Sequence, residues 1–315
     1  MTNNALITGG FGFLGKNLTQ RLLDLNFNVT LLGSPKGKVE NYNQQVSIIN
    51  ERIEKSNLDD LVKDKDYIFH LAWQTDLEES MKNPTLDISR DIVGLLNILE
   101  SCKKNNPNIK IIFPSAVTVI GLGNKLFSNE DEKENPLSIY DANKLMAEKY
   151  LSVYFKNYGI KFTSLRLSNI FGESQKIDNA KRGILNFMIG KSLRNEPLTV
   201  HGDGSFIRDY SYVQNIIDSF VIAAQSPITD GETYVIGSGE GKSFKEVVTK
   251  IQEYAKEIYK SKSEIIYIPF PEDSNAINKR NFIADSSKFK KATGWSPRVS
   301  FEDGLKKTMD FYKNE

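Results

Sequence analysis

Short runs of apolar and β-branched residues alternate with longer polar–apolar stretches through the first half of the chain. The runs lie at residues 5–8, 28–32, 46–49, 67–71, 109–113 and 161–167. Strands that alternate with helices indicate βαβ crossovers and a parallel sheet with helices on both faces. After about Asn169 the alternation loosens. The pattern therefore predicts an α/β fold, a doubly wound parallel sheet with a smaller C-terminal lobe.

Two long amphipathic helices are expected, around 87–105 and 139–158, after the fourth and fifth strands and on one face of the sheet. Apolar residues recur at helical spacing in both. The second helix has apolar residues around more of its circumference than the ~100° that a core-facing helix needs. They are Leu145, Met146, Tyr150, Leu151, Val153, Tyr154 and Phe155. A second apolar face predicts a partner, here a homodimer through these helices. The alternative is that the extra aromatic residues pack under the loop 120–136.

Composition narrows the classes of partner. The 315 residues include 41 basic and 40 acidic side chains, a net charge of +1. This balance argues against nucleic acid or a membrane surface held by bulk charge. The single cysteine, Cys102, cannot form an internal disulfide, which favours a reducing, cytoplasmic location. No apolar run approaches the ~18 residues of a membrane span, and no signal peptide is expected.

The strongest local motif is the glycine-rich segment from Thr8 to Gly15. It directly follows a predicted strand and opens a predicted helix, which is the context that a dinucleotide-binding Rossmann turn requires. Glycines let the backbone approach a pyrophosphate, and the helix N-terminus favours the anion. The predicted cofactor contacts are Gly9, Gly12, Phe13, Leu14 and Gly15. The alternative is a plain glycine turn.

The predicted adenosine end of this site lacks the usual acid. An acidic residue at the end of the second strand would bind the ribose of NAD. Here Ser34 and Lys36 follow that strand, so the sequence favours NADP slightly over NAD. A basic loop without a ligand is the alternative. Glu51, with Arg52 beside it, is a candidate contact for adenine, although an ordinary surface glutamate fits as well.

Tyr140 and Lys144 lie one helical turn apart, on one predicted helix face. A nearby cation favours the phenolate and lowers the tyrosine pKa from about 10, so that the phenol can exchange a proton near neutral pH. No other Tyr-x-x-x-Lys occurs in the chain. The pair begins a helix after the fifth strand, which favours a catalytic role.

Further segments complete a family resemblance. They are His70-Leu71-Ala72, Arg166 to Gly172, Gly202-Asp203-Gly204-Ser205 with Arg208-Asp209, and Gly294-Trp295-Ser296-Pro297. In order and spacing, these motifs resemble those of the extended short-chain dehydrogenase/reductases, the nucleotide-sugar epimerase/dehydratase group, over nearly the whole chain. The resemblance implies an NAD(P)-binding Rossmann domain at 1–168 plus about 206–236. It implies a nucleotide-sugar-binding lobe at about 169–205 and 237–315.

The same resemblance implies residue roles. Tyr140 would carry the proton, and Lys144 would orient the nicotinamide ribose and tune Tyr140. Leu71 and Ala72 would lie beside the cofactor. Asn169 and Arg208 would bind the diphosphate of a nucleoside-diphosphate sugar, although a surface ion pair with Asp209 is an alternative for Arg208. The roles of His70 would be structural, no metal is implied, and family members commonly dimerise through the two long helices.

The chain departs from the family pattern at four positions. The usual catalytic Ser or Thr falls on Ala116, and the usual Tyr on Ile120. Asp91 stands where Asn is frequent, and Gly33 where Asp is frequent. Loss of one hydrogen bond to a reacting oxygen can cost ~10²–10³ in rate. Thr118 could reach the same side as Ala116 if the chain stays extended, so it is the predicted substitute donor.

These features predict hydride transfer at sugar C4. A 4-ketoreductase is slightly favoured by the acid-free loop, and a 4-epimerase with tightly bound NAD is the alternative. A catalytically impaired dinucleotide-binding regulator is the alternative outside enzymes. A 4,6-dehydratase is disfavoured, since Val117 and Thr118 occupy the positions of its carboxylate pair. The nucleotide base and the sugar are left open.

Overall fold

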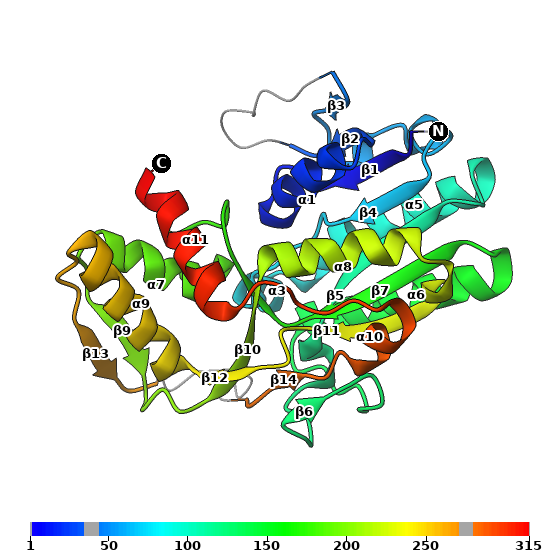
Figure 1. Ribbon diagram of the computed structural model, residues 1–315. Helices are drawn as coiled ribbons and strands as arrows, with labels where there is room; N and C mark the ends of the chain where they lie inside the picture. Colours follow the sequence, from blue (N-terminus) through cyan, green and yellow to red (C-terminus); the bar gives the residue numbers. More distant parts are fainter. Residues whose placement is uncertain (1, 35–43, 271–279, 315) are drawn as a thin grey trace.

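A seven-stranded parallel sheet forms the larger part of the molecule (Figure 1). The computed structural model describes residues 2–34, 44–270 and 280–314. The strand order is β11-β7-β5-β4-β1-β2-β3, and every neighbouring pair is parallel. The strands are β1 (Asn4–Thr8), β2 (Asn28–Leu32), β3 (Val46–Ile49), β4 (Tyr67–His70), β5 (Lys110–Ala116), β7 (Lys161–Leu167) and β11 (Glu232–Ile236). The predicted fold class is confirmed, and all six predicted strands are present.

Helices cover both faces of this sheet. α1 (Phe13–Asp24) and α8 (Val213–Gln225) pack on one face, and α5 (Val93–Asn105) and α6 (Ile139–Tyr158) on the other, as Figure 1 shows. Alternate residues of one strand enter different cores. Ala5 and Ile7 of β1 join the core under α1, whereas Leu6 joins the core under α5. This alternation explains why the central strands are apolar throughout.

The segment before α5 is less regular than predicted. α2 (Leu58–Leu61) follows β3 after the 3₁₀ turn η1 (Ile53–Lys55). α3 (Leu77–Lys82) and α4 (Pro84–Asp87) then lead into a π-helical turn, η2 (Ile88–Ile92), which continues directly into α5. A π turn carries one extra residue and often occurs at a functional site. Because the extra residue shifts the helical periodicity, the sequence pattern could not predict which residues face the core on the two sides of this turn.

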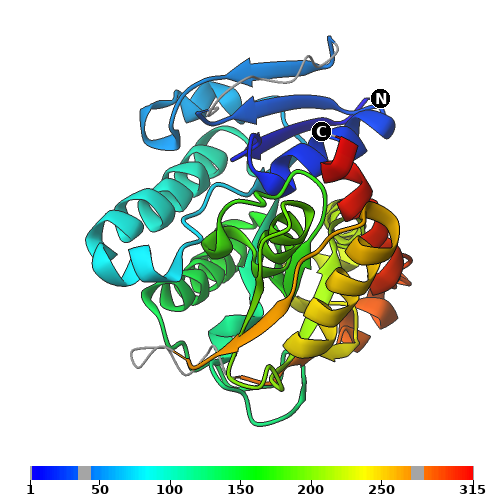
Figure 2. The same cartoon turned by 90° about the vertical axis from the view of Figure 1, so that its left-hand side faces the viewer.

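A smaller lobe is built on the carboxyl edge of the sheet (Figure 2). It contains the sheet β12-β10-β8, the pair β13-β9 and three helices. Their bounds are β8 (Asn169–Phe171), β9 (Leu198–His201), β10 (Ile207–Tyr212), β12 (Gly241–Ser243), β13 (Ile265–Ile268), η4 (Ala180–Arg182), α7 (Ile184–Leu193), α9 (Phe244–Tyr259) and α11 (Phe301–Asn314). The chain passes from the large sheet to this lobe after β7, returns from β10 into α8 and β11, and leaves again into β12.

The remaining elements join the two parts. β6 (Phe127–Ser128) pairs with β14 (Ile283–Ala284), and η3 (Val117–Ile120) and η5 (Pro227–Thr229) are short 3₁₀ turns. α10 (Ser287–Thr293) packs on β11, where the rings of Phe289 and Tyr234 are 5.0 Å apart. β10, predicted in the Rossmann segment, pairs with β8 and β12 of the smaller lobe. The predicted domain boundaries stay a prediction.

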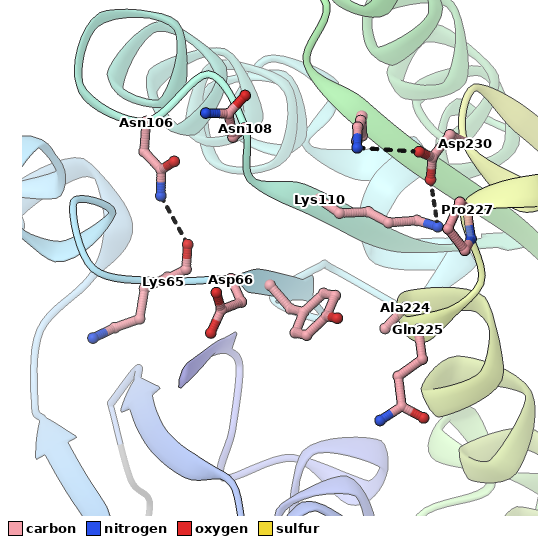
Figure 3. A pocket seen from close by; sticks show the side chains of 11 residues that line it. Lys65, Asp66, Asn106, Asn108, Lys110, Ala224, Gln225, Pro227 and Asp230 are labelled. Atoms are coloured by element: carbon pink, nitrogen blue, oxygen red, sulfur yellow. Dashed lines mark hydrogen bonds and ion pairs between the residues drawn. The ribbon is translucent and has the colours of Figure 1, made fainter. Parts of the chain in front are cut away.

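A polar pocket of about 260 Å³ opens at the amino ends of β4, β5 and β7 (Figure 3). Its centre is Lys110, whose ammonium forms a 2.6 Å ion pair with Asp230 and donates to Thr229 and to the Ser226 carbonyl, both at 2.9 Å. Lys161 shares Asp230 at 3.5 Å. These paired charges hold the elements together. Ligands of open α/β sheets bind at the other, carboxyl edge.

Across the described ranges, no helix is both long and apolar enough to cross a bilayer.

Candidate active site

The glycine turn lies at the carboxyl end of β1 and touches the segment after β4. Gly9 has a φ of +71°, and a Cβ there would lie 2.7 Å from the backbone nitrogen of Ala72. A Cβ on Gly15 would lie 2.5 Å from the Gly10 carbonyl oxygen. α1 begins directly after Gly12, with no side chain capping its first turn. The turn and Leu71–Ala72 therefore form one cradle, and it fits the pyrophosphate of a dinucleotide.

The predicted adenosine contacts follow the two neighbouring strands. Ser34 is exposed after β2, and Glu51 and Arg52 are exposed after β3. Arg52 lies 3.7 Å from Glu54, so part of its charge is directed there. Lys36 lies outside the described residues. Because β1, β2 and β3 are adjacent, the described positions form one row beside the glycine turn.

The ammonium of Lys144 is buried at the carboxyl end of β5. It donates to the Pro114 carbonyl at 2.6 Å and lies 4.1 Å from the ring centre of Trp73 and 4.5 Å from that of Phe113. The Tyr140 ring is 5.8 Å from the same ammonium, so the predicted pair does share one helix face. Burial lowers the pKa of Lys144. A nearby anion is needed to keep this ammonium charged.

The phenol of Tyr140 is held in its protonated form. Burial raises its pKa, and the carboxylates of Asp141 and Asp91 add to the effect. The start of α6 is fixed by Ser138, whose hydroxyl accepts the Asp141 N–H at 3.1 Å. Tyr140 can therefore donate a proton to a substrate oxygen, and it needs a nearby cation to take one back.

The segment after Ala116 does not stay extended. β5 ends at Ala116, and residues 117–120 form the 3₁₀ turn η3. Thr118 was expected on the side of Ala116 only if the chain stayed extended, and it does not. Burial raises the pKa of the Asp141 carboxyl and Thr118 opposes that rise, so the Thr118 side chain lies near the residue that follows Tyr140. The role of Thr118 as a donor to substrate stays a prediction.

Two buried arginines approach each other near this segment. Arg208 on β10 and Arg280 before β14 are 7% and 5% exposed. Burial lowers the pKa of each to about 10, and the charge of Arg208 contributes to the shift at Arg280. Arg280 Nη1 donates to the carbonyls of Val117 and Gly121, but its Nε has no partner in the described part of the chain. Two guanidinium groups in a buried setting fit a diphosphate.

Arg280 was missed by the sequence prediction, whereas Arg208 was included. The alternative that Arg208 serves a surface ion pair with Asp209 is wrong. Asp209 is fully buried, and it accepts backbone N–H groups of Ser238, Gly239 and Ala284. Asp209 thus fixes the turn after β11, while the Arg208 guanidinium donates to the Ile207 carbonyl at 3.0 Å and lies 5.1 Å from the ring centre of Phe206. The two arginines are 72 positions apart in the sequence, and no local pattern pairs them.

A second pocket, of about 220 Å³, lies between the lobes at the carboxyl end of β7. Asn169 and Tyr210 line it, and the two residues are paired directly in the β8–β10 ladder. Tyr210 and Arg208 share one face of β10, since they are two residues apart. The structure thereby brings predicted Asn169 to the same side of the lobe as Arg208.

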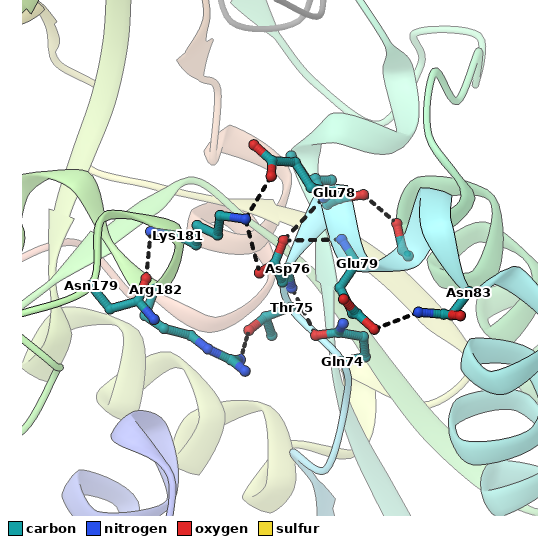
Figure 4. Close-up of polar contacts among 11 residues, drawn as sticks. Gln74, Thr75, Asp76, Glu78, Glu79, Asn83, Asn179, Lys181 and Arg182 are labelled. Carbon is teal, nitrogen blue, oxygen red and sulfur yellow. Dashed lines mark hydrogen bonds and ion pairs between the residues drawn. The ribbon is translucent and has the colours of Figure 1, made fainter.

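Side chains from both lobes meet across this pocket (Figure 4). Arg182 Nη1 donates to the Thr75 hydroxyl at 2.5 Å, and Lys181 lies 2.5 Å from Glu78 and 3.9 Å from Asp76. Asp76 itself caps α3. These contacts, which we name the interlobe bridge, join residues 75–78 after β4 to residues 181–182 before α7. Thr75, Lys181 and Arg182 also line the pocket at Asn169.

Comparisons with known proteins agree with this geometry. The model of the NAD dependent epimerase/dehydratase family matches residues 5–237. A putative UDP-glucose 4-epimerase of Methanocaldococcus jannaschii is 30% identical, with 98% of each chain covered. UDP-glucose 4-epimerase of Thermotoga maritima, solved with UDP-glucose, is 30% identical over 99% of each chain, with a TM-score of 0.88. UDP-glucuronic acid 4-epimerase of Bacillus cereus, solved with UDP-glucuronic acid and NAD, is 27% identical, with 99% of each chain covered and a TM-score of 0.85.

The family match covers the dinucleotide cradle, Tyr140, Lys144 and Arg208, whereas Arg280 lies beyond the matched residues. The family and these relatives are enzymes, which argues against the alternative of a regulator without catalytic function. This chain belongs to the NAD dependent epimerase/dehydratase family and is an NAD-dependent enzyme that modifies nucleotide sugars.

Proposed function

We propose that the enzyme is a nucleotide-sugar 4-epimerase. The observation that carries the proposal is the position of Tyr140 and Lys144 between two binding elements. Lys144 contacts Pro114 and Trp73 beside the glycine cradle, and Arg280 contacts the η3 segment that follows Ala116. A sugar whose diphosphate lies on the arginines would then reach the phenol. The full-length similarity to 4-epimerases supports the same reaction.

Tyr140 would carry the proton of the C4 hydroxyl. As the sugar is oxidised, the C4 oxygen would lose its proton to Tyr140, which must first reach its phenolate form beside the Lys144 ammonium; a bound nicotinamide would supply the hydride acceptor. Return of the hydride to the other face of the 4-keto sugar returns the proton from Tyr140 to the oxygen. Lys144 would stabilise the phenolate in the first half and orient the nicotinamide ribose throughout. The diphosphate would stay bound to Asn169, Arg208 and Arg280 while the 4-keto sugar rotates to present its other face.

A 4-ketoreductase is the second candidate. Within the described residues, only Gly33 and Ser34 follow β2, and neither is the acid that would bind the ribose of NAD. This end of the site favours NADP, and a reductase would use NADPH and release it oxidised. If the enzyme is a 4-ketoreductase, we expect it to use NADP. If it is a 4-epimerase, we expect it to keep NAD bound.

The deciding experiment separates the two by the balance of cofactor. The purified enzyme is first denatured, and the dinucleotide it releases is identified by mass. The native enzyme is then given UDP-glucose and UDP-glucuronic acid without added cofactor. Conversion to the C4 epimers with no net change in nicotinamide absorbance supports the epimerase. Turnover that occurs only with a 4-keto sugar nucleotide, with stoichiometric loss of NADPH absorbance, would establish the reductase instead.

We propose that the enzyme acts as a homodimer through α5 and α6. Exposed apolar side chains cluster on the outer face of these helices and of η2, where Met146 is 38%, Val153 49%, Val93 43% and Ile88 40% exposed. The other apolar residues of α6 pack within the protomer. Tyr154 bonds Glu100 on α5, and Phe155 packs on Phe162 of β7, so these aromatic residues do not lie under the loop 120–136. A two-fold axis would bury the exposed set in a four-helix interface.

A further inference from the structure

Asp91 is a buried carboxylate for which the proposed mechanism has no role. It is 3% exposed and lies in the π-helical turn η2, between α4 and α5. Its two oxygens accept the backbone N–H of Gln74, at 3.1 and 3.3 Å. The family resemblance leads us to expect an asparagine here, and an asparagine could accept the same hydrogen bond. The negative charge is therefore what this chain adds.

The hydrogen bond at Gln74 connects Asp91 to Lys144. Gln74 follows Trp73, and the Trp73 ring lies 4.1 Å from the Lys144 ammonium. By holding the Gln74 backbone, Asp91 fixes where that ring stands. The carboxylate and the ammonium form no direct ion pair. Burial raises the pKa of Asp91 and lowers the pKa of Lys144, and the charge of each group opposes the shift of the other.

The other charged groups around Lys144 do not supply a counter-charge of equal effect. Glu148, one turn along α6, accepts two hydrogen bonds from Arg166, at 3.0 and 2.8 Å. Burial lowers the pKa of His70, on β4, to about 3, so the imidazole is neutral. Tyr140 keeps its proton, as described above. Beside Asp91 itself stand Asp87 and Arg90, whose effects on its pKa are opposite in sign.

We propose that Asp91 is the buried counter-ion of Lys144 and a positioning residue of the active site. It keeps the ammonium charged inside a ring of aromatic side chains and fixes the Trp73 ring against it. This inference rests on the proposed role of Lys144 in tuning Tyr140. It explains why an acid is tolerated at a buried position that an asparagine could fill, because an ammonium with one carbonyl and two aromatic partners is otherwise poorly stabilised.

A direct titration of Lys144 tests the proposal without substrate. Lysine labelled with ¹³C at Cε is incorporated into the full chain, and the Lys144 signal is assigned by its absence in Lys144→Met. Asp91→Asn keeps the acceptor for Gln74 but removes the charge, so the midpoint of Lys144 should fall by about one pH unit. Asp91→Glu should restore it. Asp87→Asn, which removes an equally buried carboxylate from the same helical region, is the matched control and should leave the midpoint in place.

An unchanged Lys144 midpoint in a folded Asp91→Asn protein would overturn the proposal. If that variant does not fold, Asp91→Ser provides a smaller uncharged acceptor and the same test. The pH profile of kcat adds a second arm, in which Asp91→Asn should move the alkaline limb to lower pH, whereas a purely structural role would lower the profile without moving it. The titration stands even if the sugars chosen for the proposed function give no turnover.

Discussion

The hydroxyl of Thr8 lies 2.8 Å from Nδ1 of His70 and accepts the backbone N–H of Ala72 at 3.2 Å. The hydroxyl can donate to Nδ1 or accept from it through its second lone pair, so this contact is satisfied in either neutral tautomer of the imidazole. The contact ties the end of β1 to the end of β4, directly beneath the cofactor cradle. His70 is therefore part of the support of the site, in keeping with its predicted structural role.

The buried neutral imidazole of His70 should make the protein less stable in acid. The folded-state pKa of His70 is lowered to about 3, below the usual 6.5, because the ring is buried and Lys144 is near. The unfolded chain therefore binds a proton that the folded protein does not, and stability falls as the pH falls below about 6.5. Between pH 7 and pH 5 the loss from His70 is about 2 kcal/mol. Urea unfolding of wild type and His70→Gln at both pH values should show the smaller loss in the variant, and equal losses would contradict the assignment.

Tyr140→Phe should lower kcat by at least ~10²-fold, because the C4 oxygen loses its proton partner. The substitution removes only the hydroxyl, so the dinucleotide content and the unfolding midpoint should not change. Turnover measured with the nucleotide sugar as the only substrate checks the fall in kcat. The amount of dinucleotide released on denaturation checks that the cofactor content is unchanged. Retention of most activity would show that another group carries the proton. Thr118→Val, assayed beside it, measures whether that hydroxyl contributes.

Arg280→Gln should weaken the binding of UDP by about 10- to 100-fold, since one charge-assisted contact is lost from a buried site. Arg280→Lys should recover only part of the affinity, because an ammonium does not reproduce the planar guanidinium. Isothermal titration with UDP measures both. Arg298→Gln removes an equal charge from an exposed position and is the control. Undiminished affinity in Arg280→Gln would place the diphosphate elsewhere.

The interlobe bridge should affect substrate binding more than stability. Lys181→Ala removes an exposed ion pair to Glu78, and such pairs contribute little to the free energy of unfolding. We expect a rise of several fold in KM with kcat unchanged, because residues 75–78 and 181–182 border the pocket at Asn169. Lys250→Ala breaks a comparable exposed pair with Glu253 on α9 and should change neither constant. An unchanged KM in Lys181→Ala would show that the interlobe bridge does not contribute to substrate binding.

Light scattering should give a mass near twice that of the 35.7 kDa chain at micromolar concentration. Val153→Glu combined with Met146→Glu should reduce it to the single-chain value, because both exposed side chains would enter the interface. Ile228→Glu, at a 62% exposed apolar position on η5, should leave the dimer intact. A single-chain mass for wild type would reject the dimer. Tyr150 is half-buried against the protomer's own core and is a poorer probe of the interface.

The sequence predicted the sheet well because buried parallel strands are apolar over their whole length. The glycine turn and the Tyr140–Lys144 pair were predicted because they are local motifs that follow predicted strands. Thr118 depended on an extended backbone after Ala116, and no local pattern announced the 3₁₀ turn there. Arg280 could not be predicted, because only the tertiary fold brings it to Arg208. Asp91 was noticed as a departure, but its relation to Lys144 depends on the π turn and on Gln74, which only the structure shows.

The path of the chain between the two lobes has a consequence for folding. Because the chain leaves the large sheet after β7, returns through α8 and β11, and leaves again into β12, no single cut yields either lobe as a continuous piece. The last strand of the large sheet, β11, is added only after β8, β9 and β10 have been synthesised. The nascent chain must therefore keep β7 with an open edge until β8, β9 and β10 of the smaller lobe have emerged. The protein should therefore fold after synthesis as one cooperative unit, and partial chains released before β11 would expose that edge to aggregation.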